Sequence, residues 1–322
     1  MKRKAQSKKA TSTGRGPLAR KVIASARQHL QQKVTNIADW REARLRSEDY
    51  QRTVISKDKL TDYDPLHGLY IYAQNQLSIL IEQIAELPMV DKLADAYAEA
   101  LEGYMPSSPP MSPLTVSYFT CWGSFDLCSS GAKTETLATI ATDFAIFQHV
   151  DDGLTSLFET MQTSRMGIYR HEGASGRFVF LRELITNREV KALSASGYVG
   201  NIGEIWFVRL LPPPFENSIF DYSLVFTTPY VLGRLGPGRA FLSSVEDDWL
   251  AYFKRNLPKI HQDTEELAYD HLMKFGLSRN YWNEYIFLSY RNHRNNVIFL
   301  EGFPDVAASL PHSKEGRHAL GV

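Results

Sequence analysis

Cysteine is scarce in this chain of 322 residues, where Cys121 and Cys128 are the two present. So few thiols in so long a chain indicate reduced cysteines rather than a disulfide framework. They have neither CxxC spacing nor nearby histidines, and we predict no metal site. Long apolar runs are also lacking, since none approaches the roughly 20 residues needed to cross a bilayer. No apolar segment follows the basic N-terminus, as a secretory signal requires. We therefore predict a cytoplasmic protein without membrane contact.

Acidic residues are absent from the first 21 positions, which instead hold eight basic residues. The whole chain has 36 basic and 36 acidic residues, so positions 22–322 hold 28 and 36 and carry a net charge of −8. Residues 1–16 are predicted to be a disordered tail, because they have too little apolar surface to offset the entropy of ordering. Such an arm either binds an acidic partner or serves only as a solubilising tail. The residues expected to contact nucleic acid or another acidic partner are Lys2, Arg3, Lys4, Lys8, Lys9 and Arg15.

The part of the chain that follows the tail has helical patterns. Pro17 stands where a first helical residue would, and Asp64-Pro65 is a typical helix start. Pro88 allows a break between two helices. The helices predicted here cover 17–34, 37–45, 65–87 and 89–101. We predict one helical domain over 17–104 and an extended linker over 105–113, whose four prolines exclude a helix.

The middle of the chain, 177–232, alternates apolar runs of strand length with turn residues. The predicted strands are 178–184, 190–193, 205–211 and 222–232. Three prolines after Leu211 end the third strand, and Pro229 within the fourth indicates an edge position or a bulge. Strands at this spacing predict a small antiparallel β-barrel or a curved sheet. Two helices are predicted before it, over 136–147 and 154–161, while 114–127 has no clear pattern.

The last third of the chain is predicted to be mainly helical. Ser243-x-x-Glu246 has the spacing of a capping box, so a helix is expected to begin there. Further helices are predicted over 264–275 and 281–291, with a short strand at 297–300 and a loose tail at 311–322. The predicted fold class is therefore α+β, with a helical N-terminal part, a central barrel or curved sheet, and a helical C-terminal part. The α+β domain is predicted to cover 114–310.

Several stretches of this chain are similar to those of one group of bacterial proteins. They are SRMGIYRHEG, LRELITNRE, SGYVGNIGEIWFVRLLPPP, FTTPYVL, NYWNEYIFLSYRNHR and IFLEGFPD. Over roughly residues 115–312 the chain resembles an uncharacterised bacterial family that has no assigned activity. The resemblance implies a shared fold and transfers no catalytic residues.

Three groups of histidines and carboxylates offer metal ligation or proton transfer, and each also has a simpler explanation. Helix capping explains the first group, a solvated helix face the second and a polar turn the third. The groups are His149 with Asp151 and Asp152, then His261, Glu265, Asp270 and His271, and last His171 with Glu172. A metal-dependent hydrolase whose site is assembled from such scattered residues is one functional hypothesis.

Aromatic and basic residues near the predicted barrel indicate another kind of site. Tyr198, Trp206 and Arg209 are hypothesised to form a surface that stacks on single strands and attracts their charge. Core packing of Trp206 is the alternative, because its neighbours make the run apolar on both faces. The glycines of 197–203 lack a Walker lysine and are predicted to serve a hairpin or bulge with positive φ.

The sequence favours a non-enzymatic binding or adaptor protein that contacts nucleic acid or a nucleoprotein assembly through its basic arm. The charge split between tail and body supports this hypothesis. Nothing in the sequence specifies a cofactor, an oligomeric state or an enzymatic activity.

Overall fold

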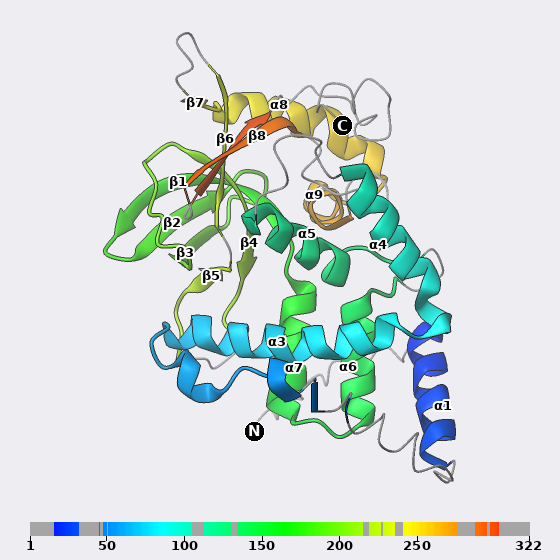
Figure 1. Ribbon diagram of the computed structural model, residues 1–322. Coiled ribbons are helices and arrows are strands. Elements are labelled where there is room, and N and C mark those ends of the chain that lie inside the picture. Colours follow the sequence, from blue (N-terminus) through cyan, green and yellow to red (C-terminus); the bar gives the residue numbers. More distant parts are fainter. Residues whose placement is uncertain are drawn as a thin grey trace, which may run out of the picture.

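The computed structural model describes residues 16–31, 45, 48–49, 51–104, 113–129, 134–214, 219–226, 228–235, 241–275, 287–294 and 297–302. Its fold class is α+β, as predicted, with helices before and after a closed five-stranded barrel (Figure 1). In Figure 1 the barrel lies on the left, with α3 below it and α8 above it. The helices of the N-terminal part therefore pack against the barrel.

The helices before the barrel begin where local sequence favours a start. They are α1 (Pro17–Gln31), η1 (Lys57–Leu60), α3 (Pro65–Ala85), η2 (Pro88–Val90), α4 (Asp91–Tyr104), α5 (Pro113–Phe125), α6 (Leu137–Phe147) and α7 (Asp152–Thr163). The Asp64 carboxylate accepts hydrogen bonds from the first backbone N–H groups of α3, with Pro65 at the first helical position. Thr136 caps α6 through reciprocal bonds with Thr139. The predicted start at residue 65 and the break at Pro88 are confirmed, and the stretch without a clear pattern forms α5.

Some predictions fall on residues that the structure does not describe. These are residues 1–15 of the basic tail, the helix at 37–45 apart from Leu45, the linker at 105–112 and the tail at 311–322. The start of α1 is described, and the Glu135 carboxylate accepts hydrogen bonds there from the backbone N–H groups of Leu18 and Ala19 at 3.0 and 2.9 Å. A residue distant in sequence thus caps this helix.

The barrel is a closed ring of strands. Its members are β1 (Met166–Ser175), β2 (Phe178–Glu183), β3 (Glu189–Ser194), β4 (Ile205–Leu211) and β5 (Ser223–Val225). They pair in the order β1-β2-β3-β5-β4, and β4 pairs back to β1. β1 pairs with β4 over residues 166–170 and with β2 over residues 169–175, and a bulge between His171 and Gly173 changes its direction. Closure gives every strand of the ring two partners, so the barrel has no open edge.

The barrel differs from the prediction in three respects. β1 belongs to the ring although the predicted β segment began after it. The predicted strand 222–232 is two strands, β5 and β6 (Tyr230–Leu235), because Pro229 between them cannot donate to a ladder. The ring is also not purely antiparallel, since β3 and β5 run parallel with Ala192 opposite Ser223. Hydrophobic pattern gives the length of a strand but not its direction.

Further strands branch from β4 and continue into the C-terminal part. β6 pairs with β4, and beyond it lie β9 (Val297–Gly302) and β8 (Phe287–Arg294). β7 (Phe241–Ser243) pairs with residues 233–235 of β6. The helices here are α8 (Glu246–Asn256), η4 (Leu257–Ile260) and α9 (Glu265–Phe275). The predicted helix at 264–275 and strand at 297–300 are confirmed.

Two predictions for the C-terminal part are wrong. Ser243 is the last residue of β7, paired with Gly233, so it does not cap a helix, and α8 begins after Val245 without a side-chain cap. The predicted helix over 281–291 is contradicted where the structure describes it, because residues 287–294 form β8. Aromatic residues suit both a helix stripe and a strand, and here pairing with β9 decides the outcome.

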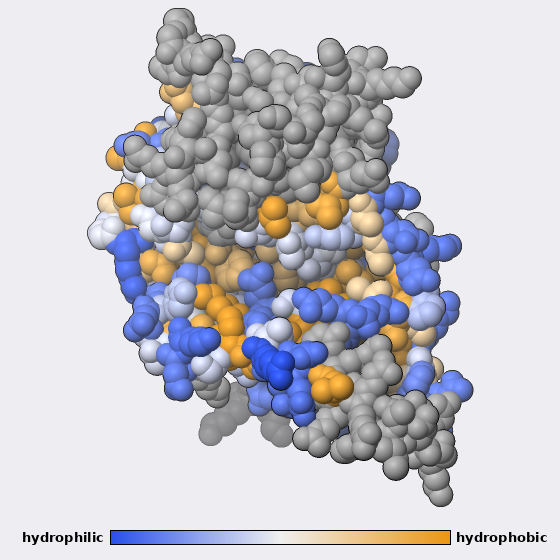
Figure 2. Space-filling model, in the orientation of Figure 1, coloured by the Kyte–Doolittle hydropathy of each residue, from blue (hydrophilic) through white to orange (hydrophobic). Residues whose placement is uncertain are grey.

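Two clusters of buried side chains form the core. One lies inside the barrel and contains Trp206, Val208 and Leu210 of β4, and the other packs the outer side of β4 against the helices. This larger cluster also contains Leu66 and Tyr70 of α3, so the helical part and the barrel share one core. Figure 2 shows hydrophilic residues along α3 and a band of hydrophobic residues above it. Among the described helices, none is long and apolar enough to cross a membrane.

Candidate functional site

The predicted barrel surface of Tyr198, Trp206 and Arg209 does not form. Trp206 lies inside the barrel with its side chain fully buried, and Arg209 is buried on the outer side of β4 against Asp126. Tyr198 is half-buried and donates a hydrogen bond to Glu204. The alternative of core packing describes Trp206 correctly, because the barrel interior covers one face of β4 and the helices cover the other.

The loop between β3 and β4, residues 195–204, covers one end of the barrel. Gly197, Gly200 and Gly203 all have positive φ, as the sequence predicted for this stretch. The buried Glu204 carboxylate accepts hydrogen bonds from the Trp206 indole at 2.9 Å and from the hydroxyl of Tyr198 at 3.0 Å. These bonds fix the loop on the barrel.

His171 faces the same loop from β1 and is buried inside the barrel. Its Nε2 donates to the carbonyl of Val199 at 2.7 Å, and its Nδ1 is buried without a hydrogen-bond partner among the described residues. Burial lowers the pKa of His171, although the bond to Val199 and the nearby charges of Glu204 and Glu172 oppose the shift. The imidazole is therefore held neutral as a structural group of the barrel end.

The histidines and carboxylates of the hydrolase hypothesis have separate structural roles. Asp151 caps α7 by accepting from the N–H of Leu154. Glu265 begins α9, and Asp270 on the same helix is paired with Arg165. Within the described ranges, no three His, Cys, Asp or Glu side chains are grouped so that they could hold a metal ion. Cys121 and Cys128 are both buried.

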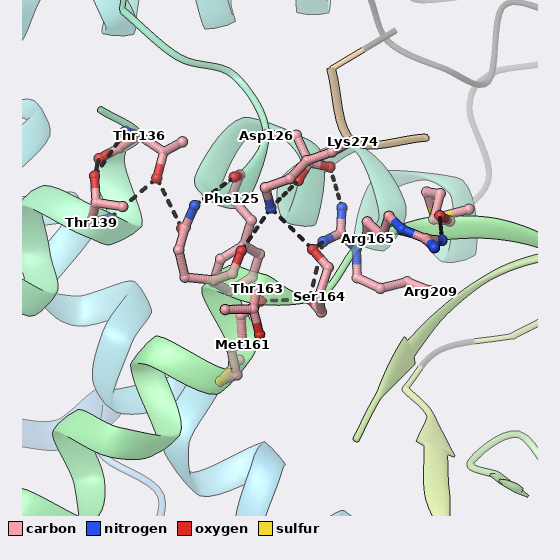
Figure 3. Close-up of polar contacts among 12 residues, drawn as sticks. Phe125, Asp126, Thr136, Thr139, Met161, Thr163, Ser164, Arg165, Arg209 and Lys274 are labelled. Carbon is pink, nitrogen blue, oxygen red and sulfur yellow. Dashed lines mark hydrogen bonds and ion pairs between the residues drawn. The ribbon is translucent and has the colours of Figure 1, made fainter. Parts of the chain in front are cut away.

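A buried ion network fixes the turn between α7 and β1 (Figure 3). Asp126 is paired with Arg209 and, at 3.2 Å, with Lys274 of α9. Both cations also donate to the backbone carbonyl of Ser164, at 2.9 and 3.0 Å. Burial lowers the pKa of Lys274, and the charge of Asp126 opposes this shift. The network therefore anchors residues 163–165, which the sequence leaves without an obvious role.

Arg165, at the end of this turn, is bound by two carboxylates. It contacts Glu183 at 2.6 Å and Asp270 at 2.6 Å. Burial alone would raise the pKa of Glu183, but the hydrogen bonds and charges of Arg165, Thr186 and Arg188 together hold it below its usual range. Glu183 is thus a buried anion that positions Arg165 at the end of the barrel where β1 begins.

The outer side of β2 and β3 carries aromatic and basic side chains next to one another. We define the β2–β3 face as Arg177, Phe178 and Phe180 with Lys191 and Tyr222. Phe180 lies directly opposite Lys191 in the ladder and is 40 % exposed. The Lys191 ammonium lies 4.5 Å from the centre of the Phe178 ring, and the Arg177 guanidinium lies 5.3 Å from it. Rings and cations therefore alternate over adjacent positions of one surface.

Neighbouring groups hold the β2–β3 face in place. The Tyr222 hydroxyl donates to Asp64 at 2.8 Å, and burial together with this bond raises the pKa of Tyr222 to about 12. Lys191 is bonded at 2.8 Å to Asp221. Since Asp64 also pairs with Arg177, the N-terminus of α3 orders one edge of the face.

A cleft of about 510 Å³ opens beside this face, at the end of the barrel where β1 begins and β4 ends. Its lining includes Val190 and Leu210, the Pro212-Pro213 pair, and charged residues at the rim. Lys191 and Tyr222 line the cleft and also belong to the β2–β3 face. The face and the cleft are thus continuous. Of the residues in the hydrolase hypothesis, Asp270 is the member that lines this cleft.

The sequence analysis did not single out the aromatic residues of the β2–β3 face. A usable signal was present in the predicted strand 178–184, where Phe178 and Phe180 alternate with the buried Val179 and Leu181. That period of two shows that the two phenylalanines share a face. The contribution of Tyr222 had no such signal, because the parallel pairing of β3 with β5 brings it there.

No protein-family model, curated protein or solved structure matches the chain. The family membership indicated by the sequence stretches remains a prediction.

Proposed function

We propose that this protein is a non-enzymatic binding protein for single-stranded nucleic acid, and that the β2–β3 face is its contact surface. The observation that carries the proposal is the close approach of rings and cations on this face, where the exposed Phe180 lies opposite Lys191 and Lys191 also lies over the half-buried Phe178. Bases stack on aromatic rings while lysine and arginine attract the phosphates, a combination that tolerates any sequence.

The barrel architecture supports the choice of face. Five-stranded Greek-key barrels of the OB type bind oligonucleotides on strands 2 and 3, and the ring order here places β2 beside β3 in the same way. This is an analogy between folds, so the residues of the face carry the argument. The basic arm, with Lys2, Arg3, Lys4, Lys8, Lys9 and Arg15, would add phosphate contacts and lies outside the described residues.

Equilibrium binding of a fluorescent single-stranded oligonucleotide, read by anisotropy, tests the proposal. Phe180→Ala should weaken binding by about 1–3 kcal/mol, which is roughly 5- to 150-fold, because one stacking ring is lost. Ile202→Ala is the matched control, since Ile202 is 73 % exposed in the loop that covers one barrel end and belongs to neither the face nor the cleft. Lys191→Gln should also reduce the slope of log affinity against log salt by about 0.7. Absence of binding by the full chain at low salt would refute the proposed function.

A further inference from the structure

The cleft beside the β2–β3 face has the volume and the mixed lining of a small-molecule site. Its volume of about 510 Å³ falls within the range of about 300–1,000 Å³ that is typical of small-molecule sites. Val190, Leu210 and the Pro212-Pro213 pair supply apolar wall, and the hydroxyl-bearing Thr163 lies at its edge. These residues offer a nonpolar surface against which a flat ring can pack, and the other lining residues are polar or charged.

The lining of the cleft offers both a hydrogen-bond donor and hydrogen-bond acceptors. Arg188 is the available donor, since its side chain is 60 % exposed and approaches one carboxylate oxygen, Glu183 Oε2, at 3.7 Å. The Asp221 and Glu189 carboxylates are exposed acceptors on the same rim.

The charges of the lining also balance. It contains three cations, Arg165, Arg188 and Lys191, and three carboxylates, Glu189, Asp221 and Asp270. A balanced site does not favour a bare phosphate, which would meet the three carboxylates. A neutral group with both donors and acceptors on its edge is the better match.

We propose that this cleft receives one unstacked nucleobase of the strand that lies on the β2–β3 face. The inference rests on the proposed function, because Lys191 and Tyr222 border both surfaces and would direct a bound strand past the cleft. A base has apolar ring faces for the walls and a polar edge for Arg188 and the rim carboxylates. The strand thus contributes one base to a pocket while its other bases stack outside.

The test compares Thr163→Trp, which adds a bulky ring at the cleft, with Thr163→Ala, which leaves the cleft open. Thr163 is exposed at the end of α7, and its hydroxyl bonds to the carbonyl of Thr160, one turn earlier. We expect Thr163→Trp to weaken binding of a labelled single-stranded oligonucleotide at least 5-fold, while Thr163→Ala changes it less than 2-fold. Arg188→Gln, a substitution at an exposed side chain, should weaken it 3-fold or more and serves as a second variant if the tryptophan disturbs folding.

A competition experiment distinguishes a base from a phosphate as the occupant of the cleft. It also distinguishes failure of the cleft assignment from failure of the proposed function. Free guanosine and adenosine at millimolar concentration should displace part of the labelled strand from the wild type but not from Thr163→Trp, and inorganic phosphate should not. Equal oligonucleotide affinity of the wild type, Thr163→Trp and Arg188→Gln would overturn the cleft assignment and leave the proposed function standing. Competition by phosphate instead of nucleosides would do the same. Absence of oligonucleotide binding by the wild type would overturn both.

Discussion

The buried Asp126 carboxylate is the residue on which the α7–β1 turn depends most directly. It faces two cations, Arg209 and Lys274, that are themselves largely buried, and both donate to the backbone of Ser164. Removing one partner of a buried ion pair leaves an uncompensated charge, which costs far more than losing a pair at the surface.

Asp126→Asn should therefore lower the free energy of unfolding by about 3–5 kcal/mol, because Arg209 and Lys274 would then face each other without an anion. Urea denaturation followed by circular dichroism gives the value. Asp49→Asn is the matched control, since Asp49 pairs with Arg52 at an exposed site and should change stability by less than about 1 kcal/mol. A loss below 1 kcal/mol for Asp126→Asn would contradict this account of the network.

His171 should make stability depend on pH. Because burial lowers the pKa of His171, the unfolded chain takes up a proton at a higher pH than the folded protein does. Its contribution is fully present above the ordinary histidine pKa and is lost as the pH falls below about 6.5 towards the lowered value. Burial also lowers the pKa of His67, so wild-type stability alone does not isolate this effect.

The comparison of the wild type with His171→Gln isolates the pH dependence of stability that is due to His171. The free energy of unfolding, measured by urea denaturation from pH 8 to pH 5, should differ most at pH 8 and less as the pH falls. A difference that stays constant across this range would show that His171 does not titrate in this way.

At the scale of elements, the loop over 195–204 shows how glycine positions shape one end of the barrel. Gly203 has φ +89° and open space where a Cβ would lie, while Gly200 has φ +65° and a Cβ there would lie 2.5 Å from Trp206. The two positions therefore separate backbone strain from steric conflict.

Gly203→Ala should destabilise the protein by about 1–2 kcal/mol through the backbone alone. Gly200→Ala should cost about 1–3 kcal/mol more, because the Trp206 ring must also move within a packed barrel. Chemical denaturation gives both values, and a shift in tryptophan emission is expected for Gly200→Ala. Equal costs at the two positions would mean that Trp206 has room to adjust.

At the scale of the whole molecule, the helical part and the barrel are bound together by side chains as well as by the shared core. Tyr70 of α3 donates to the carbonyl of Pro212, and Asp64 holds both Arg177 and Tyr222. Tyr118 of α5 likewise donates to the carbonyl of Thr228. The predicted division at 105–113 thus separates segments that depend on each other for burial.

We expect thermal unfolding of the full chain to show one cooperative transition. Near-UV circular dichroism, which reports on the tyrosines and tryptophans of the interface, should share its midpoint with the far-UV signal. A fragment of residues 113–322 should lack this transition, because the faces covered by α1 and α3 would be exposed. Two separate midpoints, or a stably folded fragment, would instead support independent domains.

The sequence alone determined the lengths and boundaries of most elements and the α+β class, because capping residues, prolines and hydrophobic period act locally. Asp64-Pro65, Pro88 and the triple proline after Leu211 each act through the backbone of their immediate neighbours. The tertiary structure decided strand direction, the helix-or-strand state of residues 287–291, and which aromatic residues are exposed. Trp206 is buried and Phe180 is open only because β4 is covered on both faces and β2 on one. Residues 178, 191 and 222 meet through parallel pairing of β3 with β5, a contact between distant parts of the chain that no local pattern encodes.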